Sequence, residues 1–101
     1  MRASLNGSFY TVVAEIDDVR EFAKSWPCHG LNLDAEYTFE FSAKNGDIID
    51  LSGTEDGKPF DTSDSGAALS ALSEDAGRYG AETLGLEDVL AIRFPASAPR
   101  R

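Results

Sequence analysis

A chain of 101 residues has room for one hydrophobic core, and its 42% hydrophobic and 10% aromatic content argues against disorder. It carries 18 acidic residues against nine basic ones, a formal net charge of −9. Because a field of that sign repels nucleic acid and anionic membrane, we expect direct contact with neither and a basic protein surface as the partner.

Three of the nine basic residues, Arg2, Arg100 and Arg101, stand near the ends of the sequence, so the expected folded body carries 18 acids against six bases. The single cysteine, Cys28, excludes an intramolecular disulfide and is typical of a reducing compartment. The first seven residues lack the apolar run of a signal peptide, and no stretch approaches the roughly 20 apolar residues of a membrane span. These features predict a cytoplasmic protein.

The first expected element is a strand over residues 9–14, which are aromatic and β-branched and follow the turn signal Asn6-Gly7. A helix comes next, because Asp18 as N-cap with Glu21 three residues later approximates a capping box. The proline after its apolar stripe ends this helix. The stripe is expected to consist of Val19, Phe22, Ala23 and Trp26.

Residues 36–42 alternate between aromatic and polar side chains, which predicts a half-buried antiparallel strand with residues 47–51 as its hairpin partner. A two-residue loop would set Phe41 opposite Asp50 and place a carboxylate on the aromatic face. We therefore expect a three-residue loop over residues 44–46, since a one-residue slip exchanges the two faces. That register pairs Phe41 with Ile49 and Phe39 with Leu51, and turns Glu40, Ser42, Ile48 and Asp50 outward.

Residues 52–64 are rich in turn residues and predict a polar loop with Phe60 as its apolar anchor. A second helix is expected over residues 65–79, with Gly80 as its C-terminal stop. Residues 86–92 are either a short helix or an edge strand, and we favour the helix. The second helix is expected to bury Leu69, Leu72, Ala76 and Tyr79.

These elements predict a single acidic α+β domain over residues 1–95, followed by a disordered tail over residues 96–101. The expected order is strand–helix–strand–strand–helix–helix. A three-stranded antiparallel sheet with the helices on one face would bury both apolar stripes and the aromatic face together.

Cys28 and His29 are the first residues to consider for catalysis. A catalytic thiolate needs a base that reaches it in space, and adjacent side chains rarely do so. A zinc site would need two further ligands, and the acidic residues of the loops lack the spacing of a calcium-binding loop. We therefore expect no enzymatic activity, no cofactor and no metal, and keep a small enzyme or metal protein using Cys28 and His29 as an alternative.

The run Phe-Ala-Lys-Ser-Trp-Pro-Cys-His-Gly-Leu at residues 22–31 precedes an aromatic strand at residues 37–41 and an Asn-Gly-Asp turn at residues 45–47. Over residues 19–92 the chain resembles small uncharacterised bacterial proteins of phage, plasmid and other mobile-element neighbourhoods, with Trp-Pro-Cys-x-Gly-Leu as the distinctive part. The resemblance transfers no site residues. It implies a setting in which small acidic proteins include inhibitors of host defence, among them anti-CRISPR proteins and DNA mimics.

The leading hypothesis is a non-enzymatic binding module whose acidic surface engages a basic, nucleic-acid-handling protein, as such an inhibitor would. A second hypothesis is a self-associating homodimer with Ile48 and Trp26 in the contact, although for Trp26 we favour packing in the core. The residues expected to bind a partner are Asp47, Asp50, Glu55, Asp56, Trp26 and Ile48.

Overall fold

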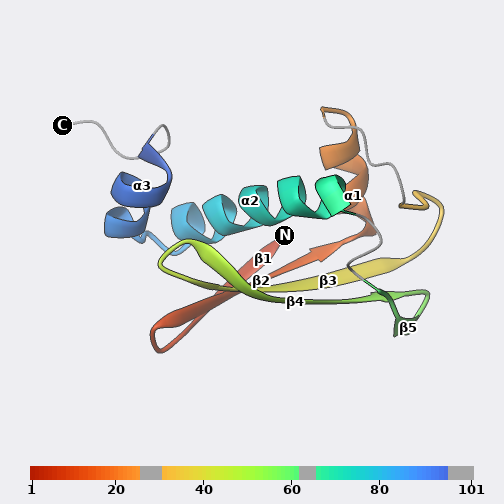
Figure 1. Cartoon of the computed structure of the whole chain (residues 1–101), viewed down its shortest axis with the longest axis horizontal. Helices are drawn as coiled ribbons and strands as arrows, with labels where there is room; N and C mark the ends of the chain where they lie inside the picture. The colour runs from red at the N-terminus through yellow and green to blue at the C-terminus, as the bar shows by residue number, and fades with distance from the viewer. Residues whose placement is uncertain (26–30, 62–65, 96–101) are drawn as a thin grey trace.

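The computed structural model describes residues 1–25, 31–61 and 66–95, and over these it has five antiparallel strands and three helices (Figure 1). The α+β class is confirmed, but the expectation of three strands is wrong. None of the helices in the described ranges is long and apolar enough to cross a membrane. The elements are β1 (Arg2–Asn6), β2 (Phe9–Glu15), α1 (Ile16–Ala23), β3 (Tyr37–Lys44), β4 (Asp47–Glu55), β5 (Lys58–Pro59), α2 (Gly66–Thr83) and α3 (Glu87–Arg93).

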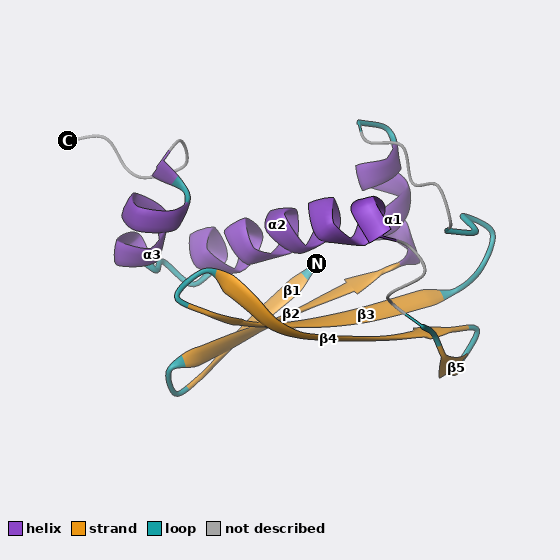
Figure 2. Cartoon of the chain, viewed as in Figure 1, coloured by secondary structure: helices purple, strands orange, loops and turns teal. Residues whose placement is uncertain are grey.

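The sheet is a meander in which each strand pairs with the next, in the order β1-β2-β3-β4-β5. Helices α1 and α2 lie over the same face, while α3 stands beyond one end of α2 (Figure 2). No described helix covers the opposite face. We call these the covered and the uncovered face. The helix favoured for residues 86–92 is confirmed as α3.

The core lies between the covered face and α2. Phe39 and Phe41 are completely buried, as the alternating pattern predicts. The anchor Phe60 is confirmed as well, because its ring meets Phe39 edge-on with the centroids 5.9 Å apart. The other completely or almost completely buried large side chains are Tyr10, Val12, Val19, Tyr37 and Leu72.

Strands β1 and β5 are the two that the sequence interpretation missed. β1 lacks aromatic and β-branched residues, and it forms because Gly7 (φ +62°) folds it back onto β2. β5 follows a tight turn in which Asp56 and Gly57 both have positive φ, +51° and +81°. Asp-Gly is a strong hairpin signal, so this turn was readable within the segment interpreted as a polar loop.

The turn between β3 and β4 is the two-residue loop Asn45-Gly46, so the expected three-residue loop is wrong. Both residues have positive φ, +53° and +88°, as a type I′ hairpin requires. The loop sets Lys44 opposite Asp47. If the strands paired regularly from this turn, the Asp50 carboxylate would lie on the aromatic face. The sequence analysis favoured the longer loop because it avoids that placement.

A β-bulge at Ile49 removes that conflict. Beyond it, Asp50 is on the uncovered face and Leu51 on the covered one. Ile49 is 55% exposed and Ile48 packs against the core, so the expected directions of these two isoleucines are reversed. The expected pairs are wrong: the structure pairs Phe41 with Leu51 and Phe39 with Gly53.

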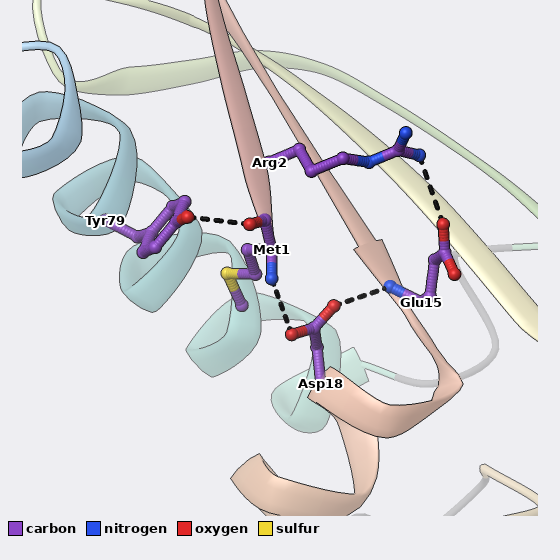
Figure 3. Close-up of polar contacts among 5 residues, drawn as sticks. All are labelled: Met1, Arg2, Glu15, Asp18 and Tyr79. Carbon is purple, nitrogen blue, oxygen red and sulfur yellow. Dashed lines mark hydrogen bonds and ion pairs between the residues drawn. The ribbon is translucent and has the colours of Figure 1, made fainter.

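Helix α1 begins two residues before the expected N-cap, Asp18. The N-cap is Glu15, and Asp18 is the third helical residue, whose side chain accepts the Glu15 backbone N–H at 2.9 Å. Asp18 also binds the amino group of Met1 at 2.6 Å, and Arg2 binds Glu15 at 3.1 Å (Figure 3). Arg2 therefore belongs to the folded body, contrary to expectation. Of the expected stripe, Trp26 lies outside the described residues.

Helix α2 does not stop at Gly80 but continues to Thr83, and Gly85 follows it in the left-handed conformation (φ +68°). Gly80 is buried where the helix touches the sheet. A Cβ there would lie 2.5 Å from Tyr10 Cε2 and 2.8 Å from Val12 Cγ2. The glycine is therefore required by the close approach of helix and sheet, and has no capping role.

We predict that Gly80→Ala destabilises the fold, because the gain in helix propensity of about 1 kcal/mol is smaller than an overpacking cost of up to about 3 kcal/mol at this contact. Urea unfolding would measure the change. Ser70→Ala, on the exposed side of the same helix, is the control and should be neutral or slightly stabilising. An equal effect of both substitutions would contradict this account.

Candidate functional site: an acidic corner of the sheet

The four acids expected to bind a partner do not form one surface. Asp47 lies at the β3–β4 turn, and Glu55 and Asp56 lie at the far end of β4. A strand rises about 3.3 Å per residue, so Asp47 and Asp56 stand about 30 Å apart. Asp50 lies between them on the uncovered face.

Asp47 is matched by a cation. Its Oδ1 accepts a hydrogen bond from Arg93 Nε at 3.0 Å, and Arg93 also binds Glu74. These hydrogen bonds raise the pKa of Arg93, with Asp47 the largest cause. Asp50 accepts the backbone N–H of Leu51 at 3.0 Å. Asp47 therefore has an ion pair, whereas Asp50 has a hydrogen bond to the backbone.

Glu55 and Asp56 lie beside Glu36, which the sequence interpretation did not single out, and Asp34 precedes Glu36 by two residues in the chain. We call these four residues the acidic corner; Figure 1 shows that the end of β4 and the start of β3 share one end of the sheet. The Glu36 N–H donates to Asp56 Oδ1 at 2.9 Å, and the Asp56 N–H donates to Glu36 O at 2.8 Å. Asp34, Glu36 and Asp56 are exposed, and Glu55 is half-buried.

Tyr37 contacts the acidic corner from the core side of the sheet. Its ring stacks on Phe39 with the centroids 5.3 Å apart. Its hydroxyl donates to Glu55 Oε2 at 2.5 Å and accepts the Asn32 N–H at 2.9 Å. Burial raises the pKa of Tyr37, the hydrogen bond to Glu55 and the charges of Glu55 and Asp56 raise it further, and the Asn32 N–H lowers it. The neutral hydroxyl thus fixes Glu55 at the rim of the core.

The corner differs from most of the surface in its ion pairing. Within the described residues, none of its four carboxylates has an ion pair with a Lys, Arg or amino group. Glu40, Asp50, Glu87 and Asp88 also lack one there, but they lie on the uncovered face or in the first turn of α3. The acids that have an ion pair in the described residues include Glu15, Asp17, Asp18, Glu21, Asp47, Glu74, Asp75 and Glu82.

In the described part of the chain, no three His, Cys, Asp or Glu side chains converge as metal ligands would. Lys58 is opposite Glu55 in the β-ladder, so one base lies beside the corner. Carboxylates that do not converge suit several distinct positive groups on a partner better than one small ion.

Three further candidates lie outside the described residues: Trp26, Cys28 and His29. The distinctive Trp-Pro-Cys-x-Gly part of the resemblance lies there with them. Ile48, the remaining candidate, is half-buried against the core and is not an exposed contact.

Comparison of the chain with protein-family models, curated proteins and solved structures finds no match. The mobile-element setting therefore stays a prediction from the sequence.

Replacing Tyr37 by Phe removes the two hydroxyl hydrogen bonds, and we expect a loss of about 1 kcal/mol in unfolding free energy near pH 8. The folded-state pKa of Tyr37 is raised, so its contribution is complete below the unfolded value of about 10 and is lost as the pH rises above it. The stability gap between parent and Tyr37→Phe should therefore narrow above about pH 10. Urea unfolding at both pH values tests this, and a pH-independent gap would contradict it.

Proposed function

We propose that this chain is a small binding module whose acidic corner engages a basic segment of a partner protein. The observation that carries the proposal is the contrast in ion pairing: the four carboxylates of the corner have no ion pair within the described residues, whereas most acids on the described helices have one. A partner's Lys or Arg residues would complete the corner without first breaking an internal ion pair.

The corner also has a fixed shape, which favours binding. The Glu36 N–H donates to the Asp56 carboxylate and the Asp56 N–H donates to the Glu36 carbonyl, so these two residues are held together, and Tyr37 holds Glu55. Fixed carboxylates lose little conformational entropy when a partner docks. Each exposed charge contact contributes only about 0.2–1 kcal/mol, so affinity depends on several contacts made together.

The partner class follows from the charge. A protein that handles nucleic acid exposes clustered Lys and Arg, which is the surface that an acidic module attracts and nucleic acid competes for. An inhibitor of such a protein, anti-CRISPR-like or acting as a DNA mimic, is the finer form of the proposal. It is supported by the net charge of −9 and by the resemblance of residues 19–92 to mobile-element proteins.

The test uses a fluorescent arginine-rich peptide as the basic probe and two matched variants. Glu36→Gln, Glu55→Gln and Asp56→Asn together remove three corner charges while keeping oxygen acceptors. Fluorescence anisotropy should show affinity about tenfold lower, from three contacts of about 0.5 kcal/mol each. Raising the salt from about 50 to about 200 mM should weaken the parent's binding.

The control removes three ion-paired acids, through Asp17→Asn, Glu21→Gln and Glu82→Gln, and has the same net charge. It should lose less than about twofold in affinity, because those charges are already matched. Equal losses in the two triple variants would show that the overall field binds the probe, and the proposal for the corner would be wrong.

A further inference from the structure

The outer edge of β1 has backbone groups with no partner. Asn6 and Phe9 flank a two-residue turn and form a hydrogen-bonded pair. Hydrogen-bonded pairs alternate along an antiparallel ladder, so the N–H and C=O groups of Ser4 and Arg2 also point toward β2. The N–H and C=O of Ala3 and Leu5 then point away from the sheet. In the described part of the chain no strand lies beyond β1 (Figure 2).

Met1 provides an independent check of this alternation. Its carbonyl belongs to the same outward set as Ala3 and Leu5, and it accepts the hydroxyl of Tyr79 at 2.6 Å, not a group of β2 (Figure 3). Tyr79 thus occupies the outward-facing hydrogen-bond acceptor at the Met1 end of the β1 edge. The outward groups of Ala3 and Leu5 have no such cover among the described residues.

The opposite edge of the sheet is protected against pairing. The bulge at Ile49 interrupts β4, and the Asp50 carboxylate accepts the Leu51 N–H at 3.0 Å. Where β5 covers β4, the outward position is Pro59, which has no N–H to donate. β1 has neither proline nor bulge, so of the two edges of the described sheet only this one presents a regular donor and acceptor pattern.

The charge around β1 identifies its partner. Residues 1–14 contain no Asp or Glu, although the chain carries 18. A basic strand would find no carboxylate on β1, and an acidic strand would meet the overall net charge of −9. A second copy of β1 brings the same acid-free strand, so the two paired strands set no carboxylates against each other.

We propose that two copies of this chain pair antiparallel along β1, centred on Ser4, and extend one sheet into the other. Ala3 and Leu5 of each copy then exchange N–H···O bonds with Leu5 and Ala3 of the other. On the uncovered face Ser4 meets its own counterpart and Arg2 meets Asn6, so no like charges stand opposite each other. On the covered face Leu5, which is 55% exposed in one copy, packs beside Ala3.

This inference is separate from the acidic corner, and salt distinguishes the two. Binding of a basic probe at the corner weakens with salt. Pairing of two chains of net charge −9 should strengthen with salt, because screening reduces their repulsion while the backbone hydrogen bonds persist.

Cross-linking tests the register. In a Cys28→Ser background, Ser4→Cys places two thiols at a non-hydrogen-bonded pair with Cα atoms about 4.5 Å apart, within reach of a disulfide. Asn6→Cys is the control, since its two copies would lie four residues apart along the pair, about 13 Å. Under a mild oxidant, Ser4→Cys should give a covalent dimer at least about tenfold faster than Asn6→Cys. Equal rates would overturn the register.

Sedimentation of the unaltered chain from micromolar to millimolar concentration tests the dimer itself, at low and at high salt. Leu5→Pro removes an outward N–H without touching the β1–β2 ladder and should weaken the dimer about tenfold, whereas Leu5→Ala, which keeps that N–H, should weaken it less. A chain that stays monomeric throughout, or a dimer that weakens with salt, would overturn the proposal.

Discussion

The close contact between α2 and the centre of the sheet is the constraint on which the rest of the structure depends. Gly80 lets the helix lie directly on Tyr10 and Val12, and Tyr10 donates its hydroxyl to Gly77 O at 2.8 Å. The aromatic row of β3 is buried under the same helix. Because α1 and α2 cover that side, the polar side chains lie on the outer sides of the helices, on the uncovered face, at the strand edges and in the turns.

The sequence predicts those parts of the fold in which buried side chains recur at regular intervals along the chain. The alternation in residues 36–42 and the run at residues 9–14 report burial on one side of a strand, and both strands form. β1 has no such pattern, since its place comes from pairing with β2. The bulge at Ile49 has no local signal either, because it is selected by the cost of turning Asp50 toward the core.

Only part of the acidic corner could be predicted from the sequence, because its other contacts also depend on the fold. The sequence shows Glu55 and Asp56 as candidate acids, but net charge does not show which carboxylates form an ion pair in the folded protein. Asp47 has Arg93, which comes from a helix 46 positions later in the chain. Glu36 joins the corner only because the Asp56-Gly57 turn brings Asp56 against the backbone at the start of β3, across 20 positions.

The difference between the two sheet edges limits how large an assembly of this chain can grow. An isologous contact uses the same strand from both copies, so two molecules joined through β1 have no second β1 to offer. Head-to-tail addition at the other edge would have to displace the Asp50 carboxylate from Leu51 and pair with Pro59. In the proposed pairing, Pro59 and Asp50 would therefore limit the assembly to two copies and would oppose the open-ended addition of sheets that leads to fibres.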